Sequence, residues 1–230
     1  MAANESALLP SQRMRVAYTL TLVGGYLDAY TYFERGGVFA NAQTGNIVKL
    51  AIALAHGESA TYLQFLLPIL TFALGLFAAL TIQEKLEEHG MRLKRRAVLA
   101  TEIVALAIVG LIPLEPQNNA LANCIVSFVA AMQYEAFSTF RGDAIATTMS
   151  TGNLRKFVDA LYAGTLQHDP EKLAHAAKFL SVILVFFFGA FLGTRFCDVL
   201  NKSAVVPPIV CLALAIVFIT LLRRRARPEE

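Results

Sequence analysis

The sequence predicts an all-α membrane protein whose six transmembrane helices form two inverted three-helix repeats. Three observations lead to this fold: the composition, the placement of the basic residues and an internal repeat. Of the 230 residues, 56% are hydrophobic and 16% are charged, and the mean hydropathy is +0.54. Soluble domains carry about 25% charged residues, so this chain lacks the charge to cover a water-exposed surface. The composition excludes a disordered chain and a basic nucleic-acid-binding domain.

Six stretches are apolar enough for helices that cross about 30 Å of hydrocarbon, which takes roughly 20 residues each. Residues 59–83 and 203–222 contain no Asp, Glu, Lys or Arg. Residues 97–114 contain one such residue, Glu102, which we expect to pair with Arg95 or Arg96. We predict a single transmembrane domain over residues 1–230, with spans near 14–34, 61–83, 96–114, 118–140, 176–197 and 204–222.

Lysine and arginine accumulate on the cytoplasmic side of membrane proteins, and their placement tests this set of spans. With the N-terminus inside and six crossings, 16 of the 20 basic residues lie in inside segments and 4 lie outside. An additional crossing at residues 46–55 would destroy this bias. The pattern therefore predicts a multi-pass membrane protein with both termini in the cytoplasm, and with a basic cytoplasmic tail at residues 223–230.

The chain repeats itself at an offset of 107 residues. Residues 28–57 align with residues 135–164, and 9 of the 30 positions are identical. The identities include a polar triplet, Thr-Gly-Asn, at 44–46 and 151–153, which apolar composition alone does not explain. We therefore predict a first repeat near residues 14–114 and a second near 118–222.

Each predicted repeat contains three spans, and this odd number has a geometric consequence. Two copies of such a unit must lie in the membrane with opposite orientations. Inverted repeats of this kind recur in transporters, where the solute site lies near the bilayer midplane between the two repeats.

The segment GGYLDAYTYFERGGVFANAQTGN at residues 24–46 resembles the signature of the YoaK-like family of bacterial multi-pass membrane proteins, domain of unknown function 1275. The Gly-x-x-Asp-Ala and Gln-Thr-Gly-Asn elements carry the resemblance, which extends over nearly the whole chain. It implies a membrane location and this number of spans. It implies no substrate and no activity.

A short apolar helix follows each Thr-Gly-Asn triplet. The first is predicted to end at Gly57 and the second at Gly164, so each is long enough to cross about half of the hydrocarbon. We expect the triplets to cap these half-helices and to direct their N-terminal N–H groups into a central cavity, where such ends favour anions. The alternative is a pair of amphipathic helices that lie on the membrane surface, and the sequence leaves this open.

Two carboxylates occupy equivalent positions in the repeats, Asp28 and Glu135. An ionised side chain at the bilayer centre costs about 2.5–3.5 kcal/mol, so a carboxylate inside a span points to function, here proton carriage or cation binding. The alternative is a structural carboxylate that accepts N–H groups of the Thr-Gly-Asn loop. The predicted solute- or ion-binding residues are Asp28, Gln43, Thr44, Gly45, Asn46, Glu135, Thr151, Gly152 and Asn153.

Three classes of function follow from these features. The first is a small secondary transporter or channel for a small solute, which the helix N-termini suggest is anionic and the carboxylates suggest is proton-coupled. The second is a membrane scaffold or regulatory subunit. The third, an intramembrane enzyme, lacks a catalytic motif, so we expect no enzyme, no cofactor and no metal site. The expected partners are the lipid bilayer and a small-molecule or ion substrate. Helix faces of small residues also permit a homodimer. No nucleic-acid partner is expected.

Overall fold

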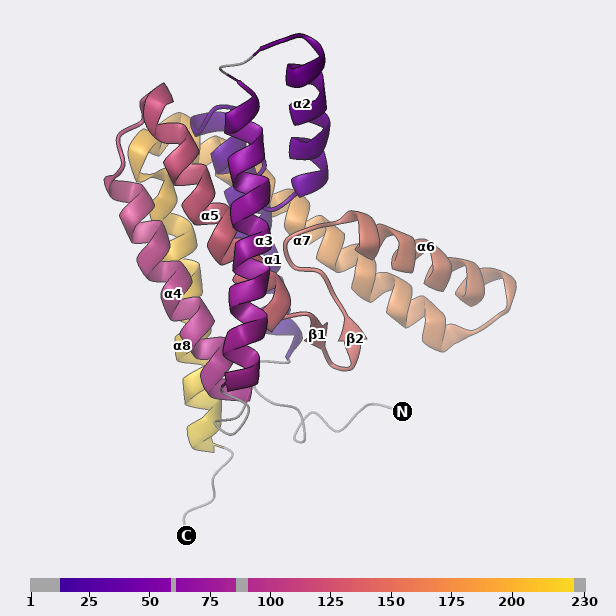
Figure 1. Ribbon diagram of the computed structural model, residues 1–230. Coiled ribbons are helices and arrows are strands. Elements are labelled where there is room, and N and C mark those ends of the chain that lie inside the picture. The colour runs from indigo at the N-terminus through magenta and orange to yellow at the C-terminus, as the bar shows by residue number, and fades with distance from the viewer. Residues whose placement is uncertain (1–12, 59–60, 86–90, 226–230) are drawn as a thin grey trace.

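The computed structural model describes residues 13–58, 61–85 and 91–225, and these residues are almost entirely helical (Figure 1). A two-stranded antiparallel hairpin interrupts the helices after α5, and a short 3-10 helix separates α7 from α8. The elements in chain order are α1 (Met14–Glu34), α2 (Gln43–Ala55), α3 (Tyr62–Lys85), α4 (Met91–Leu111), α5 (Pro116–Ala136), β1 (Thr139–Phe140), β2 (Asp143–Ala144), α6 (Thr151–Leu166), α7 (Pro170–Leu200), η3 (Asn201–Val205) and α8 (Val206–Arg225).

Each of the six predicted spans is a helix, and the all-α fold class is confirmed. The fourth predicted span is too long, because α5 ends at Ala136 and the chain then forms the β1–β2 hairpin. The fifth is too short. Its helix, α7, begins at Pro170 because the Asp169 carboxylate accepts hydrogen bonds from the backbone N–H groups of Glu171 (3.0 Å) and Lys172 (3.3 Å). Residues 226–230 of the predicted basic tail lie outside the described residues.

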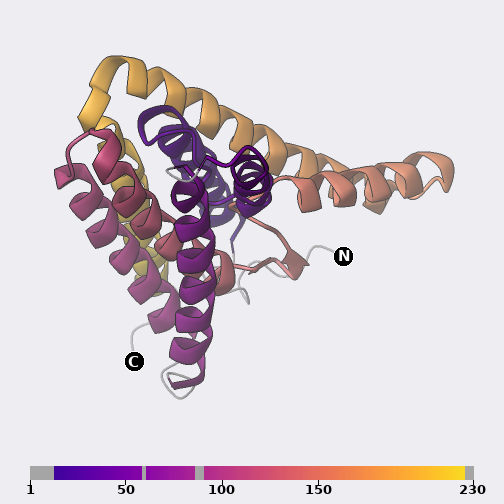
Figure 2. The ribbon, with the colours of Figure 1, turned by 45° about the horizontal axis from the view of Figure 1, so that its top comes forward.

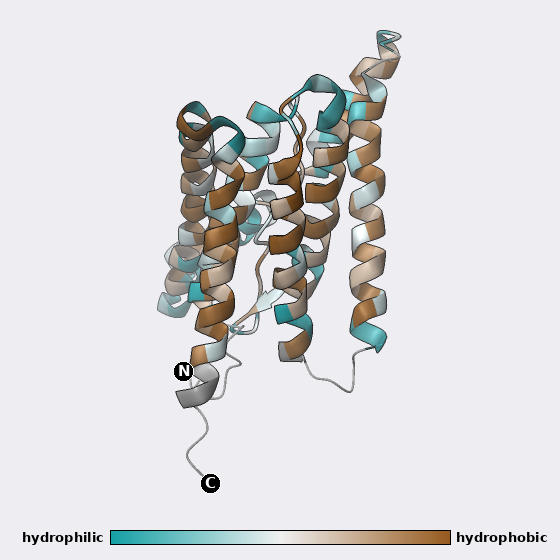
Figure 3. Ribbon diagram, turned by 90° about the vertical axis from the view of Figure 1, so that its left-hand side faces the viewer, coloured by the Kyte–Doolittle hydropathy of each residue, from teal (hydrophilic) through white to brown (hydrophobic). Residues whose placement is uncertain are grey.

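Two stretches of the described chain are long and apolar enough to cross a bilayer by length and composition. They are Tyr62–Lys85, which is α3, and Pro170–Leu221, which comprises α7, η3 and most of α8. Apolar residues fill the middle of the helices and hydrophilic residues lie mostly near their ends (Figure 3). These features are those of a membrane-associated protein.

The polar residues of α1 and α5 have a structural explanation, because both helices are largely buried by other helices. In α1, Asp28 and Thr31 are both buried, and in α5 Asn123, Ser127 and Gln133 are buried. A helix surrounded by protein does not need a uniformly apolar surface. This explains why α1 and α5 are less apolar than α3 and α7.

The main helix contacts connect the two halves of the chain. Helix α1 packs along α7, and α5 packs along α3. Glycines permit both contacts. A Cβ added at Gly189 would lie 2.2 Å from the Leu22 carbonyl oxygen of α1, and one at Gly75 would lie 2.3 Å from the Phe128 carbonyl oxygen of α5.

The two short helices are placed differently. Helix α2 lies beside α3, whereas α6 packs on the first part of α7, and this pair extends away from the other helices (Figures 1 and 2). The arm formed by α6 and the start of α7 carries apolar side chains on its surface, among them Leu154, Val158, Leu161 and Leu173.

We predict that Gly75→Ala and Gly189→Ala each destabilise the protein by about 1–3 kcal/mol, the usual cost of overpacking. The added methyl group meets backbone of the facing helix, which cannot rotate away. Thermal unfolding of the detergent-purified protein, followed by circular dichroism, measures the effect.

Gly152→Ala is the matched control, since an added Cβ there meets nothing within 4 Å. Alanine in a helix is up to about 1 kcal/mol more favourable than glycine. The packing account would be contradicted by equal melting temperatures for the Gly75, Gly189 and Gly152 variants.

Candidate functional site

The loops that precede α2 and α6 are held by equivalent asparagines. Asn46 accepts a hydrogen bond from the Phe39 N–H (3.0 Å) and donates to the Phe39 carbonyl (2.6 Å). Asn153 makes the same two contacts with Ala146, at 3.3 and 2.7 Å. In both cases one amide satisfies both backbone groups of the residue seven positions earlier. These asparagines therefore fix the path of each loop as it enters its helix.

Two lysines that lie about one helical turn after these asparagines also bond equivalent positions of the two loops. Lys49 donates to the Gly37 carbonyl, and Lys156 donates to the Ala144 carbonyl. Both the lysines and the carbonyls are separated by 107 residues, the offset of the sequence repeat. The internal similarity thus extends from residue identity to hydrogen bonding.

The prediction that the Thr-Gly-Asn triplets cap the helices is wrong in its detail. The helices begin at or next to the triplets, but the N-cap positions are Ala42 and Ser150, and neither makes a side-chain cap hydrogen bond. The triplets form the first turn instead, because their asparagines are engaged by the preceding loop. The predicted end at Gly57 is confirmed, since α2 ends at Ala55, and Gly57 has a φ of +69°.

The end predicted for the second short helix is also wrong. Helix α6 continues through Gly164 to Leu166. Gly164 serves as a packing position, because a Cβ there would lie 2.6 Å from a methyl carbon of Leu173 in α7. The close approach of α6 and α7 therefore accounts for this glycine.

A cleft of about 630 Å³ lies where the N-termini of α2 and α6 meet α1 and α7. Helix α1 contributes Asp28, and α2 contributes Thr44. Thr151 and Gly152 come from α6. Four of the nine predicted site residues therefore border one cleft, from both halves of the chain. The other lining residues are Ala29, Tyr32, Phe33, Phe39, Ala42, Met149, Ser150, Phe186, Ala190 and Thr194.

Asp28 is the one carboxylate among the described residues that line the cleft, and it is 6% exposed. Its Oδ1 accepts a hydrogen bond from the Asn41 N–H at 2.8 Å. Asn41 in turn donates through its side chain to the Gly24 carbonyl at 2.7 Å. Asp28 therefore borders the cleft and also accepts a hydrogen bond from the loop before α2, which agrees with the structural interpretation of this carboxylate.

Buried polar groups with no hydrogen-bond partner lie next to this contact. The Asn41 Oδ1 and the Thr148 Oγ1 are buried, and neither has a hydrogen-bond partner in the described parts of the chain. These residues are 107 positions apart, and a Cβ on Gly24 would lie 3.2 Å from the Thr148 Cα. Buried polar atoms are nearly always satisfied by protein or ordered water. The region around Asn41 and Thr148 could therefore accommodate a water molecule or a polar group of a ligand.

The remaining predicted site residues lie away from the cleft lining. Gln43 donates to the Ala40 carbonyl (2.7 Å) and accepts from Asn46 (2.8 Å). Gly45 packs against the Phe39 ring, which a Cβ would approach to 2.8 Å. Together with Asn46 and Asn153, these residues shape the loops and the first helical turns.

Glu135 does not join Asp28. It lines a separate cavity of about 140 Å³ with Gln83, Lys94 and Arg95, and Gln83 Nε2 lies 3.5 Å from one of its oxygens. The two carboxylates have different surroundings because the segments that follow them differ in structure. The Asp28 carboxylate is covered by the loop that enters α2, whereas the β1–β2 hairpin follows Glu135 and changes the path of the second loop.

The sequence interpretation missed a buried pair between α4 and α5. Glu102 is 1% exposed, and with the Gln133 amide turned to donate, its nitrogen lies 3.2 and 2.9 Å from the two Glu102 oxygens. The expected pairing of Glu102 with Arg95 or Arg96 is wrong, because the two Glu102 oxygens face Gln133. Arg95 Nε donates instead to the Ala136 carbonyl at 2.8 Å, and its guanidinium lies over the Phe137 ring. Glu102 and Gln133 are both polar residues within apolar spans, which is the sequence signal that points to this pair.

Among the residues that the structure describes, no three His, Cys, Asp or Glu side chains are grouped so as to hold a metal ion. The cysteines Cys124, Cys197 and Cys211 are free thiols.

The fold and its apolar helices define the class: a helical, membrane-associated protein whose two short helices begin at one cleft, which is mostly apolar and contains one carboxylate, Asp28. Residues 16–218 match the family described as "Protein of unknown function (DUF1275)", and the chain belongs to this family. No curated protein and no solved structure matches the chain.

We predict that Asn46→Ala and Asn153→Ala each cost about 1–3 kcal/mol of stability, because each removes several buried hydrogen bonds of about 0.5–1.5 kcal/mol. Chemical or thermal unfolding in detergent measures this loss. The Gln117→Ala variant is the control, because Gln117 is exposed and, within the described parts of the chain, its side chain makes one hydrogen bond, to Glu115. A melting temperature for both asparagine variants equal to that of the control would rule out their role in holding the loops.

Proposed function

We propose that the protein is a small secondary transporter or channel of the bacterial inner membrane, without enzymatic activity. The solute binds in the cleft between two inverted three-helix repeats. One observation carries the proposal: the N-termini of two short helices from equivalent parts of the chain, α2 and α6, border the same cleft beside a buried carboxylate, Asp28. Transporters with inverted repeats place solutes at such interrupted helices.

The helix contacts support the two-repeat arrangement. Each of the pairs α1–α7 and α5–α3 joins a helix of one half to a helix of the other. If α1 corresponds to α5 and α3 to α7, the two pairs are equivalent contacts, as two repeats require. Gly189 packs on Leu22, and the corresponding Gly75 packs on Phe128. Helices α2 and α6 leave the cleft in different directions (Figure 1). In this proposal they are half-helices that reach opposite faces of the membrane.

Six helices cross the membrane in this proposal, and both termini are cytoplasmic. Basic residues at the start of α1, at the facing ends of α3 and α4, and between α5 and α7 support this orientation. The N-terminal end of α1, the β1–β2 hairpin and the C-terminal end of α8 lie toward the same end of the molecule (Figure 1).

The chemistry of the cleft favours a solute with an electronegative group. First-turn N–H groups lack intrahelical acceptors, and two helix N-termini contribute partial positive charge. No Lys, Arg or His is among the described residues that line the cleft, so Asp28 has no basic partner there. We assign Asp28 the uptake and release of a coupling proton as the solute enters and leaves.

We predict that Asp28→Asn abolishes solute-dependent stabilisation or proton-coupled flux, since asparagine preserves the shape of the side chain but carries no exchangeable acid. A ligand found by thermal-shift screening of anions and metabolites stabilises the folded protein by mass action. Its flux is then measured in proteoliposomes with and without a pH gradient.

Glu135→Gln is the matched control, because Glu135 occupies the equivalent sequence position but lies outside the cleft. This variant is expected to retain the ligand response of the parent protein. The proposal fails if the Asp28→Asn substitution leaves flux unchanged, or if no screened ligand alters stability while an associated membrane protein co-purifies stoichiometrically. The second outcome would support the scaffold or regulatory alternative.

A further inference from the structure

Glu102, near the middle of α4, is a buried carboxylate that the proposed transport cycle does not yet use. With the Gln133 amide turned to donate, both Glu102 oxygens lie within hydrogen-bond distance of its nitrogen, at 3.2 and 2.9 Å. Within the described parts of the chain, Glu102 makes no ion pair. An ionisable side chain inside a membrane span is costly, and such residues mark ion or proton pathways.

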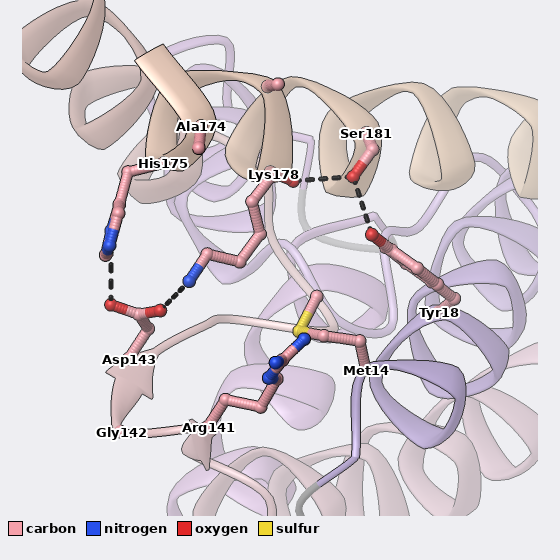
Figure 4. A pocket seen from close by; sticks show the side chains of 10 residues that line it. Met14, Tyr18, Arg141, Gly142, Asp143, Ala174, His175, Lys178 and Ser181 are labelled. Atoms are coloured by element: carbon pink, nitrogen blue, oxygen red, sulfur yellow. Dashed lines mark hydrogen bonds and ion pairs between the residues drawn. The ribbon is translucent and has the colours of Figure 1, made fainter. Parts of the chain in front are cut away.

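A carboxylate at the β1–β2 hairpin shows the contrasting case of a charge with a counter-ion. Asp143 contacts the Lys178 ammonium, and His175 Nδ1 lies 3.8 Å from its other oxygen (Figure 4). Glu102 has a neutral amide where Asp143 has an ammonium. A structural ion pair therefore explains Asp143 and does not explain Glu102.

The charged groups around α4 are engaged away from Glu102. On α4 itself, Arg95 donates to the Ala136 carbonyl. Arg35, which follows α1, donates to the Ile112 carbonyl beyond the far end of α4. The other titratable groups on the elements packed against α4, apart from the basic end of α8, are Cys124, Tyr134 and Glu135 of α5, Lys202 of η3 and Cys211 of α8. None of these is hydrogen-bonded or ion-paired to Glu102 within the described residues.

A series of buried polar contacts leads from Glu102 toward the cleft. The other end of the Gln133 amide lies 3.4 Å from the Thr147 hydroxyl, in the loop before α6. Gln133 and Thr147 are both fully buried. The Thr147 backbone in turn meets α1 at Gly24, where an added Cβ would lie 2.5 Å from the Thr147 carbonyl oxygen.

The series continues from Gly24 to the cleft. The Gly24 carbonyl accepts a hydrogen bond from the Asn41 side chain at 2.7 Å. The Asn41 N–H donates to Asp28 Oδ1 at 2.8 Å. Contacts through α5, the loop before α6, α1 and the loop before α2 therefore join Glu102 to Asp28.

Three buried oxygens beside Gly24 have no hydrogen-bond partner among the described residues. They are Thr21 Oγ1, one helical turn before Gly24, Asn41 Oδ1 and Thr148 Oγ1. Thr148 lies against α1, since a Cβ on Gly24 would be 3.2 Å from its Cα. A buried water molecule typically makes about three hydrogen bonds to such otherwise unsatisfied groups. The unsatisfied oxygens therefore favour water at the middle of the series.

We propose that Glu102 is a second carrier of the coupling proton, and that water beside Gly24 connects it to Asp28. This inference rests on the proposed proton-coupled function. In the transfer step the O–H bond of the Asp28 carboxyl breaks and a new O–H bond forms on the Glu102 carboxylate. Water and the threonine hydroxyls between them each accept one proton and donate another, so charge and protons balance. Gln133 is a positioning residue that holds the Glu102 carboxylate.

Infrared difference spectroscopy of the detergent-purified protein, between acidic and alkaline pH, tests this connection without a solute. A protonated carboxyl has a separate carbonyl band, which shifts when deuterium replaces its proton, so the exchange rate in heavy water measures proton access. Glu102→Gln identifies the Glu102 band, and Asp28→Asn identifies that of Asp28. Glu135→Gln is the matched control and is expected to leave both bands unchanged, because Glu135 lines a different cavity.

Thr148→Val then interrupts the connection. Valine has the shape of threonine, and the Thr148 hydroxyl has no partner among the described residues, so folding is preserved. We expect deuterium exchange at Glu102 to slow about tenfold, the rate effect of one lost hydrogen bond. Thr81→Val is the matched control, because the Thr81 hydroxyl bonds the Phe77 carbonyl of its own helix.

Slower exchange at Glu102 in the Thr148→Val variant than in the parent and the Thr81→Val control would support the proposal. The absence of a Glu102 carboxyl band, or equal exchange in the parent and the Thr148→Val variant, would overturn it. Because no solute is present, this outcome is distinct from that of the flux assay. Unchanged flux in the Asp28→Asn variant would reject the transport proposal and leave the measured connection between the two carboxyls in place.

Discussion

The structure depends on one constraint: backbone that is not helical must still satisfy its N–H and C=O groups inside an apolar protein. Two such segments precede α2 and α6. Asn46 and Asn153 solve the problem in the same way, since each amide bonds both polar groups of the residue seven positions before it. This hydrogen bonding permits two loops to approach the centre of a helical protein. The cleft exists because the loops end there and the helices begin.

The long helices pack around the two loops and the cleft at which they end. The loops occupy space beside α1, and small residues allow the neighbouring backbones to come close. Gly24 packs against the loop before α6, while Gly25 packs on α7 at Phe186. Helices α1 and α5 are covered by protein and therefore retain polar residues, whereas α3 and α7 carry the apolar surface. The distribution of hydropathy among the helices thus reflects their depth in the fold.

Much of the helical structure could be predicted from the sequence, because apolar runs and charged boundaries define helices independently of the tertiary fold. The repeat also identified the paired asparagines of the Thr-Gly-Asn triplets, whose contacts recur at the same offset. The common position of Thr44, Thr151 and Asp28 was predictable because the repeat related the helices that carry them. In contrast, the equivalence of Asp28 and Glu135 was misleading as a guide to the site.

That failure has a local cause. Sequence alignment relates positions along the chain, but a side chain's surroundings depend on the segment that follows it. After Glu135 the chain forms a hairpin, in which the Ile145 N–H donates to the Ser138 carbonyl, and the carboxylate lies beside Gln83 instead of a loop N–H. The sequence shows Glu102 and Gln133 as polar residues within apolar spans, but it does not show that they meet, because no local pattern determines the relative rotation of the two helices.

The central claim is that α2 and α6 reach the cleft from opposite faces of the membrane. Cysteine labelling with an impermeant maleimide tests it most directly, in a chain whose three native cysteines are replaced. The account predicts that Glu58→Cys, just after α2, reacts in intact cells, and that Gln167→Cys, just after α6, reacts only after the membrane is permeabilised. Both sites are exposed in the structure. Reaction of both cysteines from the same side would contradict the account.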